Sequence, residues 1–355
     1  MFKIKELIKN ETSVWERLKS CQKPVVLYGM GDGADKVLSA FEKYGISASA
    51  VIASDDFVRG QSFHGFTVKK LSDVENEFDD FVIALCFASQ IPNVMEHILN
   101  IAEKHETLVP SVPVFGSKLF DDDFISEYEN EIETAYALLA DEQSRRVYKN
   151  ILLFYHTGRI ELLNEITTDK SEAFNEILKL NGEESYVDLG AYNGDTIDEF
   201  LHYTGGKHGR IIAFEPNKKN FDKLSEHCRG MANVSLWQLG SYSRNTELVF
   251  NNKAGRNSAI SDKGVPTKVA TVDTILCGMA AGYIKADVEG ADLETLIGMK
   301  KTMQQFKPKL NFSAYHRFED IFRLALYINN VNPEYKIYLR HHPYIPAWDT
   351  NLYCC

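Results

Sequence analysis

No long uninterrupted hydrophobic run occurs in the 355 residues, because charged side chains break up every apolar stretch. A membrane-spanning helix needs about 20 consecutive apolar residues, so the sequence does not predict membrane insertion. Residues 1–18 are typical of an amphipathic helix, and they lack the apolar core of a signal peptide. The sequence therefore predicts a cytoplasmic protein.

Cysteine is rare, and positive charge is in deficit. The six cysteines are scattered without a CxxC spacing, which predicts free thiols rather than disulfides or a zinc site. There are 39 Lys and Arg against 50 Asp and Glu, a formal net charge of −11. Nucleic acids and anionic membranes favour a basic protein face, so neither is expected as a partner.

The chain is long enough for two α/β domains, at roughly 150 residues per domain. Apolar runs at residues 24–28, 48–53 and 81–86 are typical of buried strands, and helical patterns separate them. Strands that alternate with helices form parallel βαβ units. We therefore expect a smaller N-terminal Rossmann-like domain at residues 1–120.

A helical segment separates this half from a second α/β series. In residues 121–180, Ile132, Tyr136 and Leu139 recur at helical spacing, which predicts a helical connector. For residues 181–355 we expect parallel strands followed by an antiparallel hairpin, because two strands with no helix between them can pair antiparallel. The expected parallel strands are residues 186–189, 210–214, 234–239, 283–287 and 309–313, and the hairpin strands are residues 336–340 and 351–354. This arrangement resembles the Rossmann-like fold of S-adenosylmethionine (SAM) methyltransferases.

A glycine loop follows the first strand of this second series. It reads DLGAYNGDT at residues 188–196 and lies at the carboxyl edge of the sheet, where such folds bind ligands. A pyrophosphate prefers the bare positive end of a helix, whereas here Asp188 ends the strand and Asp195 starts the helix. Two carboxylates suit a cationic ligand, such as the ammonium and sulfonium groups of SAM. The alternative role for Asp195 is that of a helix cap.

Acidic residues also end two further strands. Glu215 comes one strand–helix–strand unit after the glycine loop, where an acid can accept both hydroxyl groups of a ribose. On the fourth strand, alternation puts Lys285, Asp287 and Glu289 on one face. Such a polar row is unusual in a buried parallel strand, so we expect its end to open into the ligand crevice. Alternatively, Glu289 and Asp292 cap the following helix.

Four sequence blocks, DLGAYNGDT, AFEPN, TVDTI and IKADVEGAD, occur in this order, and YHRFEDIF, NPEYKIYLRHH and WDTNLY follow them. The chain from about residue 130 to residue 355 thereby resembles the FkbM-type SAM-dependent methyltransferases. By this resemblance, the family transfers a methyl group from SAM, commonly to hydroxyls of sugars, glycans or polyketide-type metabolites. The resemblance implies a SAM site with Glu215 at the ribose, Gln238 near the adenine and Asp287 beside the transfer site. The implied residues of the glycine loop are Asp188, Gly190, Tyr192, Asn193, Gly194 and Asp195.

Methyl transfer from a sulfonium to a hydroxyl requires alignment of the reactants and removal of the hydroxyl proton. Histidine suits that proton transfer near neutral pH, and His316 comes three residues after the strand at residues 309–313. We therefore predict His316 as the general base. Asp287 or Glu289 is the alternative base, provided that neighbouring carboxylates raise its pKa. These residue types are compatible with a divalent metal, but no spacing signature supports one, and none is predicted.

The N-terminal half has a glycine loop of its own, GMGDGA at residues 29–34. It approximates the dinucleotide-binding pattern, with Gly29 and Gly31 in the loop and Asp55 at the end of the second strand. This half resembles the small Rossmann-like domains that are attached to sugar-modifying enzymes. One prediction is a nucleotide or nucleotide-sugar site, and the other is packing or oligomerisation without a ligand.

The leading functional prediction is a SAM-dependent methyltransferase that O-methylates a sugar, a glycan precursor or a related small metabolite. One alternative is an NAD(P)-dependent oxidoreductase built on the N-terminal domain, although the DLGAYNGDT block has no role in such an enzyme. Another is a non-catalytic scaffold that binds a nucleotide or SAM. The expected partner is a small-molecule or saccharide acceptor, and a homo-oligomer is compatible with the sequence.

Overall fold

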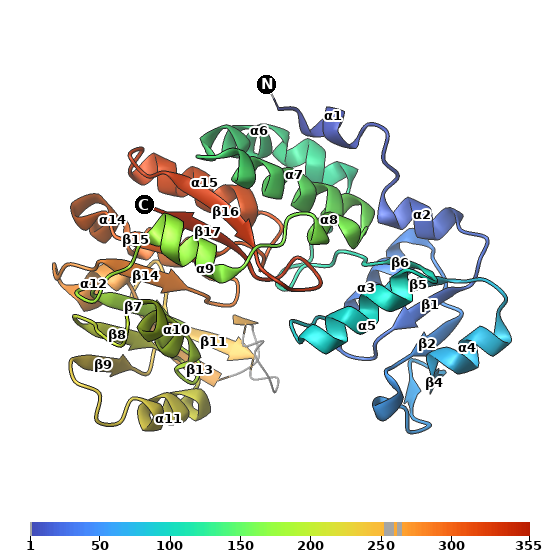
Figure 1. Ribbon diagram of the computed structural model, residues 1–355, viewed down its shortest axis with the longest axis horizontal. Coiled ribbons are helices and arrows are strands. Elements are labelled where there is room, and N and C mark those ends of the chain that lie inside the picture. Colours follow the sequence, from blue (N-terminus) through green and yellow to red (C-terminus); the bar gives the residue numbers. More distant parts are fainter. Residues whose placement is uncertain (1, 252–258, 261–264) are drawn as a thin grey trace.

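A computed structural model of the protein describes residues 2–251, 259–260 and 265–355. Figure 1 shows two lobes, each built around a β-sheet, with helices α6 (Asp122–Leu138) and α7 (Glu142–Thr157) along the top of the molecule. The chain begins near α6, forms the N-terminal lobe, returns through the helical segment and then forms the C-terminal lobe (Figure 1). The predicted α/β class, with Rossmann-like sheets in both halves, is confirmed.

The N-terminal sheet has the strand order β3-β4-β2-β1-β5-β6, and its strands are parallel except for the β3–β4 pair. Its strands are β1 (Val25–Tyr28), β2 (Ala50–Ile52), β3 (Ser62–Phe63), β4 (Phe66–Lys69), β5 (Val82–Leu85) and β6 (Glu106–Leu108). The helices around it are α3 (Asp32–Tyr44), η1 (Asp55–Phe57), α4 (Leu71–Glu77) and α5 (Pro92–Ala102). The expected strands are confirmed as β1, β2 and β5. The sequence does not predict β3, β4 and β6, because such short runs carry little periodicity.

The N-terminal segment contains two helices rather than one, α1 (Ile4–Ile8) and α2 (Val14–Ser20). Ser13 lies between them, and its hydroxyl accepts a hydrogen bond from the backbone N–H of Glu16 at 3.2 Å. A serine in this position caps a new helix. The prediction of a single amphipathic helix is therefore wrong.

The segment predicted as a connector is helical, and it packs against both sheets. After α6 and α7 it contains α8 (Glu161–Asn164), α9 (Lys170–Glu172) and the π-helix η2 (Ala173–Leu178). One continuous hydrophobic core includes Ile83 of the N-terminal sheet, Ile151 of α7 and Ile284 of the C-terminal sheet. Apolar packing through this helical segment therefore holds the two lobes together.

The C-terminal sheet has the strand order β16-β17-β15-β14-β7-β8-β9. Strands β15, β14, β7, β8 and β9 are parallel, and β17 is antiparallel to both of its neighbours. The strands are β7 (Tyr186–Leu189), β8 (Ile211–Phe214), β9 (Val234–Trp237), β14 (Tyr283–Ala286), β15 (Lys309–Ser313), β16 (Ile337–His341) and β17 (Thr350–Cys354). The helices are α10 (Asp195–Tyr203), α11 (Lys218–His227), α12 (Val272–Leu276), α13 (Asp292–Gly298), α14 (Lys300–Phe306) and α15 (Asp320–Val331). The predicted parallel sheet with an antiparallel pair at its edge is confirmed.

A further sheet lies between β9 and β14 in the chain, and the sequence pattern does not predict it. Its order is β10-β13-β11-β12, formed by β10 (Gly240–Ser241), β11 (Thr246–Asn251), β12 (Ala259–Ile260) and β13 (Val265–Ala270). It lies close against α13, since a Cβ atom at Gly298 would come within 2.0 Å of the carbonyl oxygen of Tyr242. This sheet supplies β10 to the edge of the ligand cavity described below.

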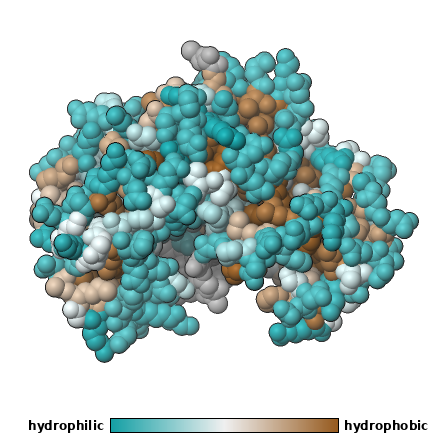
Figure 2. All heavy atoms as spheres, viewed as in Figure 1, coloured by the Kyte–Doolittle hydropathy of each residue, from teal (hydrophilic) through white to brown (hydrophobic). Residues whose placement is uncertain are grey.

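The face of the molecule seen in Figure 2 is largely hydrophilic, with apolar residues in scattered patches. Within the part of the chain that the structure describes, no helix combines the length and the apolar character needed to cross a membrane. The cysteines are free thiols, as predicted: Cys21, Cys86, Cys228, Cys277, Cys354 and Cys355.

Candidate active site

A cavity of about 280 Å³ opens at the carboxyl edge of the C-terminal sheet. Its walls come from the ends of β7, β8, β14 and β15, from β10 and from the loop before β17. Gln90 and Val114 of the N-terminal half complete the lining. The lining side chains that carry ionisable groups include Lys170, Asp195, Glu199, Glu215, Lys285, Asp287, Glu289, His316 and Asp349. A concave site with many converging polar groups is the expected form of a small-molecule site.

The glycine loop after β7 brings two strand ends into contact. Gly190 has a φ of +87°, and a Cβ atom there would lie 2.1 Å from the carbonyl oxygen of Asp287. Beneath the loop, the fully buried Asp188 accepts a hydrogen bond from the hydroxyl of Thr196, and burial raises the pKa of Asp188 to about 6. Three of the six residues predicted in this loop line the cavity: Gly190, Tyr192 and Asp195. The other three, Asp188, Asn193 and Gly194, are not part of its lining.

We predict that Gly190→Ala destabilises the protein and abolishes binding at the cavity, because the added methyl group would displace the end of β14. Gly230→Ala is the matched control, since Gly230 has a φ of +82° and open space around it. In the control, only the left-handed backbone is unfavourable, by about 1–2 kcal/mol. Denaturant unfolding measures the free energy of unfolding of both variants. An equal loss in the two would show that the close contact between Gly190 and the carbonyl oxygen of Asp287 is unimportant for stability.

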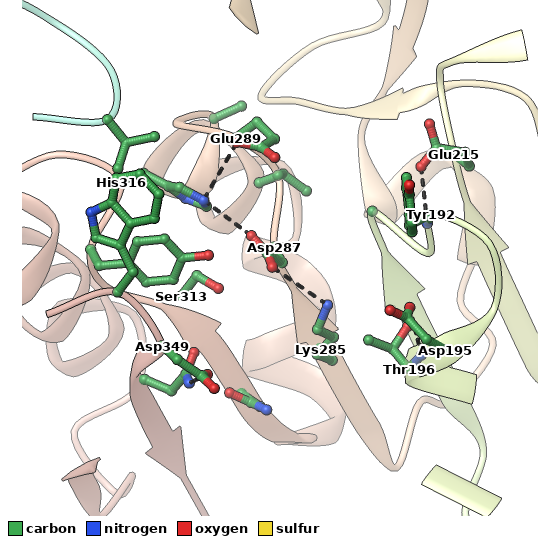
Figure 3. Close-up of a pocket in the computed structure, with 18 of the residues that line it drawn as sticks. Tyr192, Asp195, Thr196, Glu215, Lys285, Asp287, Glu289, Ser313, His316 and Asp349 are labelled. Atoms are coloured by element: carbon green, nitrogen blue, oxygen red, sulfur yellow. Dashed lines mark hydrogen bonds and ion pairs between the residues drawn. The ribbon is translucent and has the colours of Figure 1, made fainter. Parts of the chain in front are cut away.

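Glu215 lies at the end of β8 with its side chain at the cavity wall, and it is 6% exposed. One carboxylate oxygen accepts a hydrogen bond from the backbone N–H of Tyr192 at 3.0 Å (Figure 3). The other accepts one from the backbone N–H of Asn217 at 2.8 Å. Burial raises the pKa of Glu215 to about 7, although these two hydrogen bonds act in the opposite direction. The carboxylate is therefore rigidly oriented and keeps acceptor capacity for a ligand with two neighbouring donors.

Across the cavity from Glu215, the end of β14 and the loop after β15 hold a charged cluster (Figure 3). Lys285 Nζ lies 4.0 Å from Asp287 Oδ2, and His316 Nε2 lies 3.1 Å from Asp287 Oδ1. The same His316 nitrogen is 3.8 Å from Glu289 Oε2. The structure thus brings the predicted catalytic residues His316, Asp287 and Glu289 together.

The charges and burial around this cluster favour the charged forms of His316 and Asp287. Burial alone would lower the pKa of His316, but Asp292 and Asp287 raise it well above its usual value. Burial alone would raise the pKa of Asp287, but the neighbouring Lys285 and His316 lower it below its usual value. His316 therefore rests as an imidazolium and Asp287 as a carboxylate. The condition stated for Asp287 as the alternative base, a raised pKa, is not met.

Asp292 has a role that the sequence does not reveal. It is the first residue of α13, in the first turn where a carboxylate favours the helix dipole, but no side chain caps that helix through a hydrogen bond. Instead, Asp292 Oδ2 lies 2.7 Å from His316 Nδ1. Both ring nitrogens of His316 are consequently held by carboxylates, which fixes the ring and its orientation.

Gln238 does not contribute to the cavity. It is exposed and absent from the lining, whereas Gly240 and Ser241 of β10 are part of it. The predicted strand at residues 234–239 ends at Trp237, and the chain turns before β10. Gly240 and Ser241 thus line the cavity after the end of β9, and a position of Gln238 beside the adenine stays a prediction.

Aromatic residues form another part of the lining. Trp348 stacks with Tyr315 at a ring-centroid distance of 6.4 Å, and it lies 5.9 Å from Tyr344. All three rings line the cavity. Trp348 lies between β16 and β17, and no spacing in the sequence links it to Tyr315.

The N-terminal lobe is attached directly to this aromatic wall. Ser89 and Ile345 exchange two backbone hydrogen bonds of 2.8 and 3.0 Å, next to Gln90 and Tyr344. The backbone N–H of Phe115 donates to the carbonyl oxygen of His316 at 2.9 Å. The N-terminal lobe is therefore part of the wall of the cavity.

The N-terminal glycine loop has mainly packing contacts. A Cβ atom at Gly33 would lie 2.2 Å from the carbonyl oxygen of Cys86, so α3 packs tightly on the end of β5. Gly29 has a φ of +128° and also faces Cys86, while Gly31 has open space around it. Asp55 lies in η1 and is exposed, 3.5 Å from Lys70 Nζ. These contacts favour the packing role, and a nucleotide site here stays a prediction.

Comparison with known proteins identifies the class of the C-terminal half. Residues 188–344 match the family model described as the methyltransferase FkbM domain. Among solved structures, methyltransferase FkbM from Methylobacillus flagellatus is similar over 99% of this chain and 93% of its own, with 22% identity and a TM-score of 0.71. A comparison with curated proteins finds no match.

Two other solved structures are similar over about half of the chain. An rRNA methylase from Streptococcus thermophilus has 14% identity and a TM-score of 0.35, over 52% of this chain and 92% of its own. Fibrillarin from Aeropyrum pernix, with natively bound S-adenosyl-L-methionine, has 12% identity and a TM-score of 0.32, over 49% of this chain and 67% of its own.

Residues 188–344 thus match the FkbM methyltransferase domain, and this match supports a methyltransferase. A Rossmann-like N-terminal lobe precedes the matched residues. The cofactor of the protein is S-adenosyl-L-methionine. The cavity suits this cofactor, because the buried Glu215 offers acceptors for a diol and the close contact at Gly190 leaves no side chain in the way. The acidic Asp195 and Asp287 and the basic Lys285 line the same cavity.

Proposed function

We propose that the protein transfers a methyl group from SAM to a hydroxyl group of a saccharide or a related hydroxylated small molecule. The observation that carries this proposal is the fixed imidazole of His316 beside Asp287, at the edge of a cavity that also contains an aromatic wall. A histidine serves proton removal from a hydroxyl, and the aromatic wall suits the apolar C–H face of a sugar ring.

SAM, when bound, supplies an electrophilic methyl group for an in-line displacement by the acceptor oxygen. Glu215 is proposed to orient the cofactor through its ribose, and Asp287 to lie beside the reacting centre. His316 Nε2 is proposed to accept the hydroxyl proton after it has released its own proton to solvent, while Asp292 holds the ring through Nδ1. General-base assistance of this kind contributes about 10²–10⁴-fold to the rate of a reaction.

The acceptor is proposed to bind between the lobes, on the side of the cavity formed by Trp348, Tyr344 and Gln90. Polar groups near this wall are available to the hydroxyls of a sugar. They include Lys170 of α9, which pairs with Asp349 at 3.3 Å and with Glu199 at 3.5 Å. Residues 1–120, 121–180 and 181–355 are the proposed domains, and the first of them acts here as part of the acceptor wall.

The test of this function is methyl transfer from radiolabelled SAM to a panel of glycosides, nucleotide sugars and non-carbohydrate polyols. We expect a labelled methyl ether on a saccharide, identified by NMR. Trp348→Ala should raise the KM for that acceptor about tenfold or more, because an aromatic contact and its buried area are lost. Trp237→Ala is the control, since Trp237 is 41% exposed and outside the cavity lining. Turnover only with acceptors that lack a sugar ring would refute the saccharide proposal.

A further inference from the structure

Behind His316, away from the cavity, lies a second buried carboxyl group that the proposed proton transfer does not use. Asp320 is the first residue of α15 and is 4% exposed, while Asp292 and His316 are 0% and 1% exposed. One carboxylate oxygen of Asp292, one of Asp320 and one ring nitrogen of His316 all lie within 4.8 Å of one another. Two carboxyl groups therefore face each other out of contact with water, with one imidazole beside them.

The charges of this cluster do not balance if every acid is ionised. Two buried carboxylates at this distance repel each other strongly, since the surroundings screen them poorly. The imidazolium of His316 already pairs with Asp292 through Nδ1 and with Asp287 through Nε2, so its positive charge is shared between two carboxylates. The other groups that face Asp320 are Arg317, whose backbone N–H donates to Asp320 Oδ2 at 2.9 Å, and Tyr155 of α7.

Arg317 does not neutralise Asp320 by direct contact, because its side-chain Nε donates to the carbonyl oxygen of Gly290 at 3.2 Å. One oxygen atom of the cluster also lacks a hydrogen-bond donor. Among the described residues, Asp292 Oδ1 is fully buried and has no hydrogen-bond partner. A buried acceptor without a donor destabilises the folded state, so a proton nearby would stabilise the fold.

We propose that Asp320 holds a proton as a neutral carboxylic acid beside Asp292, and that this neutral form tunes the basicity of His316. The proton provides a donor for the unpaired oxygen of Asp292 and removes one of the two negative charges behind the imidazole. The raised pKa of Asp320, which is caused by burial and by the neighbouring Asp292, agrees with this assignment.

The tuning has a direct consequence for proton transfer, and in this respect it rests on the proposed function. With Asp320 neutral, a single carboxylate contacts Nδ1, and the Nε2 proton can still be released. With Asp320 ionised, two negative charges behind the ring would hold that proton more tightly and make His316 a poorer acceptor near neutral pH. The proton on Asp320 itself stays in place during the reaction. Asp320 is therefore a positioning residue rather than a catalytic one.

Infrared spectroscopy near neutral pH tests the protonation state without turnover. We expect a carbonyl stretching band of a protonated carboxylic acid in the difference between the wild type and Asp320→Asn. Selective carbon-13 labelling of aspartate separates this band from any contribution of Glu215, and it applies to the wild type alone if the variant does not fold. Asparagine has the shape of the neutral acid, so the variant is expected to bind S-adenosylhomocysteine as the wild type does.

Nitrogen-15 NMR of the His316 imidazole gives the second readout. We expect Asp320→Asn to change the pKa of His316 by less than about half a unit, whereas Asp292→Asn, which removes a contacting charge, should lower it by about 1–3 units. Absence of the infrared band, or an equal drop of the His316 pKa in both variants, would mean that Asp320 is ionised and would overturn the proposal.

A bound cation is the competing way to neutralise this cluster, because oxygen and imidazole ligands also suit divalent metals. Calorimetric titration with Mn²⁺ and Zn²⁺ distinguishes the two. Stoichiometric binding that is lost in Asp320→Asn would replace the proton by a metal and refute the proposal, while absence of binding supports it. Failure to find methyl transfer to any hydroxyl group in the acceptor panel would refute the proposed function, but it would leave the infrared and NMR results unaffected.

Discussion

Glu215→Gln is expected to weaken binding of S-adenosylhomocysteine by about 100-fold or more, because two hydrogen bonds to a charged acceptor at about 1.5–3 kcal/mol each are lost or weakened. The carboxylate is oriented by Tyr192 and Asn217 and faces the cavity from the end of β8. Calorimetric titration measures the affinity directly. Glu226→Gln is the control, since Glu226 is an exposed residue of the following helix.

The same titration has a predicted pH dependence. The pKa of Glu215 is raised to about 7, and the ionised form is the better acceptor for a diol, so the affinity should rise as the pH increases through about 7. Binding then releases a proton, and Glu215→Gln should abolish both effects. Equal affinities of variant and wild type would mean that the ribose binds elsewhere.

In the free protein, the effect of Glu215 on stability has the opposite sign. The native state binds more protons than the unfolded state between pH 4.5, the ordinary pKa of a glutamate carboxyl group, and about pH 7. The contribution of Glu215 to the free energy of unfolding therefore falls as the pH rises through this window.

His316→Gln is expected to reduce the rate of methyl transfer by about 10²–10⁴-fold, the usual contribution of a general base. Binding of S-adenosylhomocysteine should change little, because His316 is held by Asp287 and Asp292 rather than by the glycine loop. Rates under saturating acceptor and equilibrium binding, measured side by side, separate the two effects. His202→Gln is the control, since His202 is exposed on α10.

The pH profile of the wild-type rate gives a further check on His316. Its pKa is raised well above 6.5 by Asp292 and Asp287, so the imidazole is protonated near neutral pH and cannot accept a proton there. The rate should therefore increase with pH well above 6.5, and this limb should vanish in His316→Gln. A rate that is already maximal in mildly acidic solution, or unchanged in the variant, would exclude His316 as the base.

The sequence predicts those parts of the site that sit at strand ends. Glu215, Asp287 and His316 each follow a parallel strand, and the carboxyl ends of parallel strands meet at one edge of the sheet. Their proximity therefore follows from the strand pattern alone. The charges do not follow from it, because the pKa of Asp287 depends on how close Lys285 and His316 come to it in space.

Other parts of the site leave no local signal. Asp292 looks like a helix cap by position, and only the packing of the loop after β15 reveals its bond to His316. Gln90 reaches the cavity through the pairing of Ser89 with Ile345, residues more than 250 positions apart in the chain. The contribution of Gly240 and Ser241 to the cavity is not predicted, because a tight turn and a two-residue strand have too few residues to produce a periodic pattern.

The inner position of β17 has a consequence for the order in which the sheet is completed. β15 pairs with β14 on one side, but its other side is filled by β17, which comes after α15 and β16 in the chain. During synthesis from the N-terminus, one edge of β15 therefore stays open while the ribosome makes the next 36 residues, from 314 to 349. An open strand edge invites pairing with other chains. The strand that leads to His316 thus keeps one unpaired edge, where other chains can associate, until the last antiparallel strand pairs with it.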